Sequence, residues 1–329
     1  MDFSELAIPP GSLGVFEGQA MKLMAAWGGE EEMRPCHLVF AADNGILEEG
    51  VGKYPQEVTT LLAQNVAEGK AAVSCFCACN GIPYEVIDVG LASQEQVGRN
   101  RKVRLGTRNF LKGPAMTRDE YAKAHQAGRE AVREKALLGV NVFSFGEVGL
   151  GNTTTSAAVL CALSGVAPEF AVGYGANPGC HDVLMRKRQV VAEGIRKHSQ
   201  LMDSPQDIIR CVGGYDIAAL CGAMEECAAR NIPFLLDGFI TAVAFACAAK
   251  NNPQVSQVAL SSHLSREPGM KYALELGGLK AEDVPLQAGL ALGEGIGAVL
   301  GLTILKTILY TARHMGRMEE IMGKMAQSC

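Results

Sequence analysis

The chain has 329 residues, with 48% hydrophobic and 20% charged side chains and a formal net charge of −5. Such a composition is ordinary for a globular protein with a sizeable core, and the length suits one large domain or a large domain with a small companion. No cluster of Lys and Arg stands out, so the sequence gives no electrostatic sign of a nucleic-acid partner or of an anionic membrane surface.

Short apolar segments alternate along the chain with longer segments of helical periodicity. This alternation predicts an α/β fold with a parallel, Rossmann-like sheet flanked by helices. The predicted strands are 37–43, 84–90, 140–147, 169–175, 234–239 and 257–263. The predicted helices are 57–78, 117–139, 155–165, 184–199, 216–231 and 240–249. Thr117 stands before the acidic pair Asp119 and Glu120, which favours it as the cap of its helix.

Both ends of the chain are also predicted to be helical, over 11–27 and 295–325. We expect residues 1–30 and 295–329 to form a small helical domain beside a large α/β domain of residues 31–294. The apolar run 288–305 is long enough to resemble a membrane span, but it carries Glu294 and several glycines. We therefore expect a soluble protein.

The chain has eleven cysteines, and they follow no metal-binding or redox spacing; Cys75, Cys77 and Cys79 are two residues apart. They are expected to be buried thiols that behave as small hydrophobic groups. Their odd number, together with Asp2 and Glu5 where a secretory leader would be apolar, favours a reducing cytoplasm. The six histidines lack metal-ligand spacing, so no metal site is predicted.

Polar and glycine-rich motifs follow the predicted strands at their carboxyl ends, where ligands bind in an open parallel sheet. The motif from Gly149 to Thr154 lets the backbone approach a ligand closely and then begins a helix. Free N–H groups and hydroxyls at such a helix start predict an anion site, most naturally for phosphate. The alternative is a plain helix cap at a turn. A Walker A loop is excluded because its lysine is absent.

Two other functional classes are weakly suggested and not favoured. Loose Gly-x-Gly patterns occur over 173–179 and 293–301, but neither has the full spacing and the later acid of a dinucleotide-binding fingerprint. A nicotinamide-dependent oxidoreductase is therefore not expected. Ser262 and His263 are adjacent, but the sequence has no nucleophile elbow for a serine hydrolase.

Glu294 lies between two glycines in an otherwise apolar stretch. A carboxylate in such surroundings costs free energy unless it has a partner or a function. Apolar surroundings also raise the pKa of a carboxyl group toward neutrality, where it becomes useful for taking up a proton. The alternative is an acid favoured at a helix start by the helix dipole.

Several motifs together resemble a known family over nearly the whole chain. In order they are PPGSLG, FAADNGILEEGVGKYPQEVT, GEVGLGNTTTSAA, GYGAN, VGGYDIAAL, LLDGF, SSHLSREPG and LALGEGIGA. The chain resembles the nicotinate-nucleotide–dimethylbenzimidazole phosphoribosyltransferase family. This resemblance implies a parallel-sheet domain, a small domain of terminal helices and a dimer. It also implies transfer of phosphoribose from nicotinate mononucleotide to an aromatic base, with inversion at C1 and without a cofactor.

The resemblance also implies roles for particular residues. Glu294 would be the general base, and Glu147 a second acid near the ribose. The nucleotide would be held by Gly149, Gly151, Asn152, Thr153, Thr154, Gly175, Ala176, Asn177, Lys187 and Ser262. The aromatic acceptor would be contacted by Asp43, Tyr54, Leu62, Val148 and Leu292.

Three positions depart from the family pattern. Asn44 stands where the family usually has histidine, and Tyr54 and Leu62 stand where its benzimidazole pocket carries small or amide groups. Losing the amide at position 62 removes a hydrogen bond to a second ring nitrogen, which suits a phenol with its single heteroatom. A branch of the family attaches phenols through oxygen and uses two paralogous subunits. Because this chain keeps Glu294, we expect it to be the subunit that carries the base.

Two alternatives stay open at this point. The hydroxyl of Tyr54 could instead serve a purine or a benzimidazole. A chain of this family could also be a non-catalytic paralogue that stabilises an active partner, although the presence of Glu294 and Glu147 argues against that role. The expectation of a phenol acceptor also agrees with the presence of a general base. A phenol, with a pKa of about 10, gains more from a general base than a benzimidazole nitrogen does.

Overall fold

The structure is a computed structural model that describes residues 3–29 and 32–327. Within these ranges, six parallel strands form one sheet in the order β3-β2-β1-β4-β5-β6. The strands are β1 Pro35–Ala42, β2 Tyr84–Gly90, β3 Arg99–Asn100, β4 Val142–Val148, β5 Phe234–Leu236 and β6 Ala259–Ser261. The predicted Rossmann-like sheet is confirmed. Its order reverses between β1 and β4, which is the point where open sheets of this kind bind ligands.

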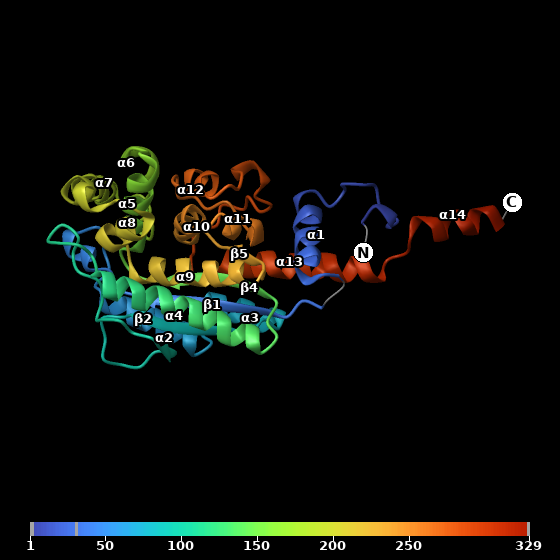
Figure 1. The fold of residues 1–329 in the computed structure, drawn as a ribbon, viewed down its shortest axis with the longest axis horizontal. Coiled ribbons are helices and arrows are strands. Elements are labelled where there is room, and N and C mark those ends of the chain that lie inside the picture. The colour runs from blue at the N-terminus through green and yellow to red at the C-terminus, as the bar shows by residue number, and fades with distance from the viewer. Residues whose placement is uncertain (1–2, 30–31, 328–329) are drawn as a thin grey trace.

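Helices cover both faces of the sheet (Figure 1). In β1, Leu38 and Phe40 pack into one apolar cluster, whereas Val39 and Ala41 pack into another on the opposite face. Burial on both faces explains why the strand is apolar apart from His37. The helices are α1 Val15–Trp27, α2 Glu57–Ala67, α3 Ala72–Asn80, α4 Arg118–Leu137, α5 Asn152–Ser164, α6 Pro168–Ala171, α7 His181–His198, α8 Pro205–Val212, α9 Tyr215–Ala229, α10 Phe239–Asn251, α11 Gln254–Val258, α12 Met270–Leu276, α13 Ile296–His314 and α14 Met318–Gln327.

Several elements differ from the sequence prediction: α8, α11 and α12 were not predicted, and the predicted helix 295–325 is the two helices α13 and α14. The segment 169–175 is not a strand: Pro168 begins the short helix α6, because proline's fixed φ suits a first helical turn, and the chain then continues without regular structure. The predicted helix 57–78 is two helices, since α2 ends before Gly69, whose φ of +78° does not fit a right-handed helix. The edge strand β3 was not predicted, because two polar residues carry no strand pattern.

Thr117 caps α4 as predicted. Its hydroxyl accepts the backbone N–H of Glu120 at 3.2 Å, and the Glu120 carboxylate accepts the N–H of Thr117 at 2.7 Å. Helix α4 then packs very closely on α9, because a Cβ on Gly128 would lie 1.8 Å from the carbonyl oxygen of Ala219. The capping box and this glycine contact together fix where α4 begins and how near it approaches α9.

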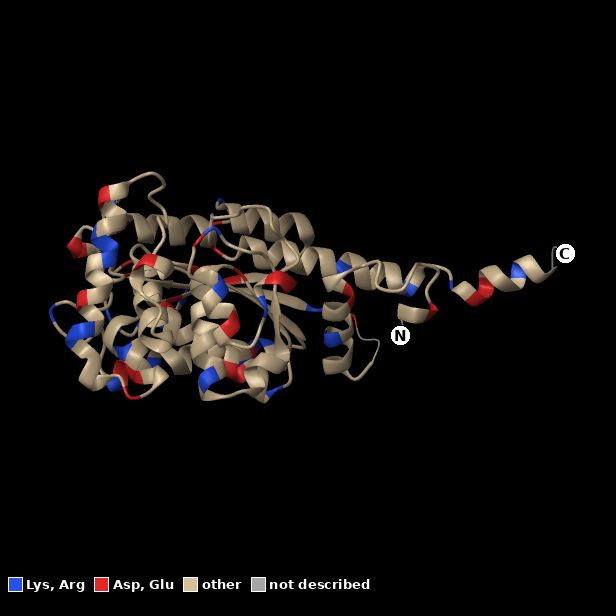
Figure 2. Cartoon of the chain, turned by 90° about the horizontal axis from the view of Figure 1, so that it is seen from above, with Lys and Arg blue, Asp and Glu red and all other residues tan. Residues whose placement is uncertain are grey.

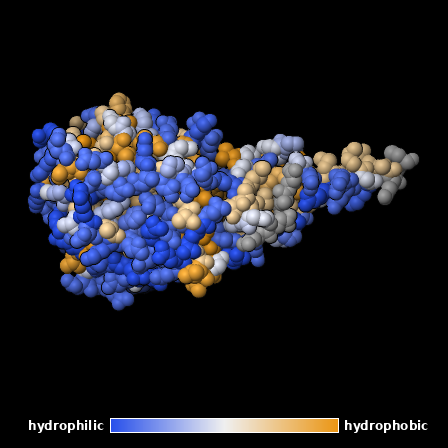
Figure 3. All heavy atoms as spheres, in the orientation of Figure 1, coloured by the Kyte–Doolittle hydropathy of each residue, from blue (hydrophilic) through white to orange (hydrophobic). Residues whose placement is uncertain are grey.

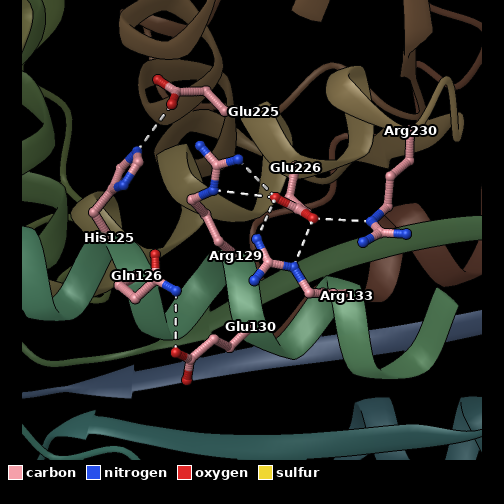
Figure 4. A network of polar contacts seen from close by, with 8 residues as sticks. All are labelled: His125, Gln126, Arg129, Glu130, Arg133, Glu225, Glu226 and Arg230. Atoms are coloured by element: carbon pink, nitrogen blue, oxygen red, sulfur yellow. Dashed lines mark hydrogen bonds and ion pairs between the residues drawn. The ribbon is translucent and has the colours of Figure 1, made fainter. Parts of the chain in front are cut away.

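An ion-pair network joins the same two helices (Figure 4). Glu226 of α9 is 3% exposed and accepts hydrogen bonds from Arg129 and Arg133 of α4 and from Arg230. Burial opposes its charge, but the three guanidinium groups lower the pKa of Glu226 to about 2. Beside Glu226, the ring nitrogen Nε2 of His125 lies 3.0 Å from the carboxylate oxygen Oε2 of Glu225.

We expect Glu226→Ala to lower the free energy of unfolding by about 2–3 kcal/mol, because three partly desolvated arginines lose their common partner. The pKa of Glu226 is lower in the folded chain than in the unfolded chain. Its stabilisation is therefore present above the unfolded value of about 4.3 and is lost as the pH falls toward 2. Urea denaturation at pH 7 and pH 3 measures both effects. Glu282→Gln, which changes an exposed acid, serves as the control. A Glu226→Ala variant as stable as the wild type at pH 7 would contradict the predicted loss of stability.

Helix α1, near the start of the chain, and helix α13, near its end, lie together. Helix α13 begins on the sheet, contacting β4 and β5, and extends beyond it, where α1 packs beside it and α14 continues outward (Figure 1). Leu302 and Leu305 share one apolar cluster with Val39 and Leu235 of the sheet. The division into two domains stays a prediction. Residues 1, 2, 30, 328 and 329 of the predicted small domain and residue 31 of the predicted large domain lie outside the described ranges.

Among the described residues, α13 is the one helix long and apolar enough to cross a membrane by length and composition. Ile296, Ala298, Val299 and Leu302 in its first half are buried against the sheet, as in the core helix of a globular protein. Acidic and basic residues are interspersed over the surrounding helices (Figure 2).

The expectation that the cysteines are buried is wrong for Cys75 and Cys79. Both are exposed on α3, whereas Cys77 between them faces the core. A helix on the surface of a sheet buries only one of its faces, and residues two apart point to different sides. Cys180 is half-buried, and Cys36, Cys161, Cys211, Cys221, Cys227 and Cys247 are buried as expected.

Candidate active site

A cavity lies at the carboxyl edge of the sheet. Its wall comes from the loops that follow β4, β5 and β6, together with the segment that leads into α13. Four acids, Glu147, Asp237, Glu267 and Glu294, line it. A second cavity adjoins the first, since both are lined by Gly149, Leu150, Asn152, Thr153 and Ala176.

Glu294 is held in an unusual backbone conformation at one end of the first cavity. Its φ is +61°, and the glycines on either side have φ of +82° and +93°. The carboxylate oxygen Oε2 accepts the backbone N–H of Val73, the second residue of α3, at 3.2 Å. Burial raises the pKa of Glu294 against the effect of this N–H, and the charge of Asp237 raises it further. Glu294 is therefore suited to take up a proton near neutral pH.

Glu147 lies on the floor of the same cavity at the end of β4 and is almost fully buried. Burial raises its pKa well above the ordinary value, and the charges of Asp216 and Asp237 add to the effect. The side-chain amide of Asn152 donates a hydrogen bond to its carboxyl group. Burial near other carboxyl groups thus favours the protonated form of Glu147, which is the form that can donate a hydrogen bond to a hydroxyl group.

The start of α5 forms the passage between the two cavities. Gly151 caps the helix with a φ of +86°, and Asn152 and Thr153 in the first turn line both cavities. Gly149 can only be glycine here, because a Cβ would lie 2.3 Å from the carbonyl oxygen of Ala42. The helix dipole at this start favours an anion, although the N–H groups of Asn152 and Thr154 donate to the carbonyl oxygens of Gly149 and Gly151.

Lys187 supplies a buried cation to the second cavity. It comes from α7, is 1% exposed, and donates to Thr153 Oγ1 at 3.0 Å and to the carbonyl oxygen of Tyr174 at 3.2 Å. Burial lowers its pKa, and the charge of Glu267 opposes that shift. Lys53 also lines this cavity, and its backbone N–H donates to Asn177 Oδ1 at 3.1 Å. The joined space therefore has cations at one end and carboxyl groups at the other.

Most residues proposed for the site from the sequence line one of the two cavities. The first is lined by Leu62, Glu147, Val148, Gly149, Asn152, Thr153, Gly175, Ala176, Leu292 and Glu294. The second is lined by Tyr54, Gly151, Asn177 and Lys187 together with the shared residues.

Three proposed site residues lie away from both cavities. The carboxylate of Asp43 accepts the backbone N–H of Ala92 at 2.8 Å, so it faces the loop after β2. Thr154 is fully buried on the core side of α5. Ser262 Oγ donates to the carbonyl oxygen of Leu236 at 2.5 Å and so joins β6 to β5. Asp43 and Ser262 are thus engaged within the fold, whereas the buried hydroxyl of Thr154 has no hydrogen-bond partner among the residues that the structure describes.

Several lining residues were not proposed from the sequence. Asp237 and His263 follow strand ends, and this position is a signal that could have identified them. His263 Nδ1 lies 3.6 Å from Asp237 Oδ1. Glu267 carries no such signal. Its carboxylate accepts the N–H of Gly175 at 2.8 Å, so it holds the loop between the two cavities. Only the folded chain brings these two residues, 92 positions apart, together.

A family model described as phosphoribosyltransferase matches residues 2–321. With the cavity described above, this match defines the chain as an enzyme of the phosphoribosyltransferase class. A relative from Clostridium perfringens named nicotinate-nucleotide–dimethylbenzimidazole phosphoribosyltransferase is 38% identical, and the match covers 96% of this chain and 87% of the relative. A relative of the same name from Thermus thermophilus is also 38% identical, and the match covers 96% of this chain and 94% of the relative. The crystal structure of CobT from Thermus thermophilus superposes with a TM-score of 0.89 at 38% identity, covering 97% of this chain and 95% of that one. The chain belongs to the nicotinate-nucleotide–dimethylbenzimidazole phosphoribosyltransferase family.

Proposed function

We propose that the chain transfers phosphoribose from nicotinate mononucleotide to an aromatic acceptor, with inversion at C1. The product would be an α-ribotide for the lower ligand of a cobamide. The polarity of the joined cavities carries the proposal, because the buried Lys187 lies at one end and Glu294 at the other. A nucleotide bound with its phosphate near Lys187 extends its sugar toward the carboxyl groups. The relatives' names support both substrates.

In the proposed reaction, the phosphate binds Lys187, Thr153 and the N–H groups at the start of α5. Glu147 donates a hydrogen bond to a ribose hydroxyl. The acceptor's lone pair forms a bond to C1 while the C1–N bond breaks, and its electrons return to the nicotinate nitrogen. Glu294 accepts the proton that the acceptor loses. The cationic pyridinium is already a good leaving group, so alignment and one base suffice and no cofactor is proposed.

We propose a phenol as the acceptor. Leu62, Val148 and Leu292 line the same cavity as Glu294, and their apolar side chains offer no partner for a second ring nitrogen. Tyr54 lies in the adjoining cavity, on the cation side. Its hydroxyl is therefore not assigned to the acceptor.

The acceptor panel tests the proposed function. Purified protein is incubated with nicotinate mononucleotide and with phenol, p-cresol or 5,6-dimethylbenzimidazole, and nicotinate and ribotide are separated by chromatography. Ribotide from a phenol supports both transfer and the phenol branch. Product from the benzimidazole alone would keep the transferase and exclude the phenol assignment. No product from any acceptor, even with a paralogous subunit added, would contradict the function.

Leu62→Gln is expected to shift acceptor preference toward benzimidazoles by about fivefold in kcat/KM, because one new neutral hydrogen bond contributes roughly 1 kcal/mol. Competition between p-cresol and dimethylbenzimidazole in one reaction measures the ratio. Leu61→Gln is the matched control, since Leu61 is the neighbouring exposed residue on α2 and lines neither cavity. Equal ratios in the two variants would contradict the pocket assignment.

We further propose a dimer, with a second copy or a paralogous chain, in which α14 packs on the partner. The helix extends beyond the rest of the chain and exposes Met318, Ile321, Met322 and Met325 (Figures 1 and 3). Such a continuous apolar face favours a protein contact. Analytical ultracentrifugation of the chain, alone and with Met322→Glu, tests this. A wild type that is monomeric both alone and with a paralogous subunit added, or a variant that stays dimeric, would contradict the assignment.

A cytoplasmic enzyme is also part of the proposal. In the described part of the chain every cysteine is free, which suits a reducing compartment.

A further inference from the structure

The backbone of Glu294 adopts a conformation that its own side chain does not favour. Its φ of +61° is in the left-handed region, where a residue with a Cβ is strained. Such a conformation persists only where the surroundings hold it, and it is common at functional sites. The contacts on the peptide that follows Glu294 therefore decide where its carboxylate points.

His37 makes the main contact on that peptide. It lies in the middle of β1, is fully buried, and its Nε2 is 2.9 Å from the carbonyl oxygen of Glu294. A carbonyl oxygen can only accept, so Nε2 carries the proton. His37 lines neither cavity, so it acts on the reaction only through Glu294.

Ser144 is the partner of the other ring nitrogen of His37. It pairs with His37 in the register of β1 and β4, and its Oγ lies 2.8 Å from His37 Nδ1. Burial lowers the pKa of His37 to about 4, so the ring is neutral at physiological pH. A neutral ring with its proton on Nε2 accepts the hydroxyl hydrogen of Ser144 at Nδ1. One serine thereby orients the imidazole toward Glu294.

Two glycines make the space for this arrangement. A Cβ on Gly146 of β4 would lie 2.1 Å from the carbonyl oxygen of Glu294, and a Cβ on Gly295 would lie 2.1 Å from His37 Cε1. The Glu294 backbone thus lies directly against the sheet and the imidazole. Its carboxylate is held from the other side by the N–H of Val73.

We propose that His37 is a positioning residue that holds Glu294 in its left-handed conformation through its Nε2–H donor, with Ser144 holding the ring at Nδ1. The proposal rests on the proposed role of Glu294 as the base. Without the Nε2 donor, the segment 293–295 relaxes and the carboxylate leaves its place beside the acceptor. The phosphate end of the site, formed by α5 and α7, is unchanged.

His37→Leu removes the donor, and His37→Gln restores one at a similar distance from the backbone. The leucine variant is expected to lose about 100-fold in kcat, since a misplaced catalytic group costs that order of rate. Its Kd for nicotinate mononucleotide should stay within about twofold, and the glutamine variant should regain most of the rate. Ser144→Ala keeps the ring and should lose less than the leucine variant. A purely structural role would instead reduce nucleotide binding and thermal stability along with the rate.

Nitrogen NMR of histidine-labelled wild-type protein provides a readout that does not depend on activity. One ring should remain the neutral Nε2–H tautomer from pH 6 to pH 8, and its signal should vanish in His37→Leu. A His37 ring that titrates in this range or carries its proton on Nδ1, or a leucine variant with the wild-type kcat, would overturn the proposal. A wild type without transferase activity but with the expected tautomer would contradict the proposed function instead.

Discussion

Replacing Glu294 with glutamine is expected to lower kcat by about 1000-fold, while the Kd for nicotinate mononucleotide stays near that of the wild type. General-base catalysis contributes rate enhancements of about 10²–10⁴. Glutamine keeps the size of the side chain and an oxygen that can accept the N–H of Val73, so the local fold should persist. Rapid-quench measurement of ribotide gives kcat, and isothermal titration gives the nucleotide Kd.

Glu282→Gln removes an exposed acid near the same segment and should leave both constants unchanged. Because burial raises the pKa of Glu294, the acid limb of the wild-type pH profile should lie above pH 4.5 and be absent in Glu294→Gln. Activity rises with pH through this limb because the base must be deprotonated. If Glu294→Gln kept more than a tenth of the wild-type kcat, another group would be the base.

Replacing Lys187 with methionine is expected to raise the Kd for nicotinate mononucleotide by about 30-fold, because a charge-assisted hydrogen bond to phosphate contributes roughly 2 kcal/mol. The loss should be much smaller for nicotinate riboside, which has no phosphate. Methionine fills nearly the same volume and removes a charge whose burial is unfavourable, so the melting temperature should not fall.

Lys250→Met is the matched control, since Lys250 is exposed at the far end of α10. Titration of both variants with the nucleotide and the riboside separates the phosphate contact from the rest of the site. An equal loss for the two ligands would place the phosphate elsewhere in the cavity.

Much of the fold could be predicted because burial leaves a pattern in the sequence. Strand β1 is apolar apart from His37 since helices cover both of its faces, and Thr117 with Glu120 forms a cap that depends only on neighbouring residues. The segment 169–175 was misassigned because its apolar residues resemble a strand locally. In the folded chain, Pro168 begins a short helix and Phe170 is exposed, so the segment is not a strand of the sheet. The exposure of Phe170 depends on the neighbouring elements and cannot be read from the segment alone.

The site was predictable to the extent that chemistry is visible in the sequence itself. Glu294 stands out as an acid among glycines and apolar residues. Lys187 does not stand out, because it lies between the two other basic residues Arg186 and Arg188. Its burial becomes apparent only in the folded chain, where α7 brings its ammonium group to Thr153. The support for Glu294 from His37 and Ser144 depends on strand register, which no local pattern records.

The configuration of the product at C1 tests the proposed transfer most directly. Wild-type protein is incubated with nicotinate mononucleotide and p-cresol, and the anomeric proton of the purified ribotide is assigned by NMR. Direct displacement of nicotinate by an acceptor activated by Glu294 predicts the α-ribotide alone. A β-ribotide or a mixture of anomers would contradict single inversion in this cavity.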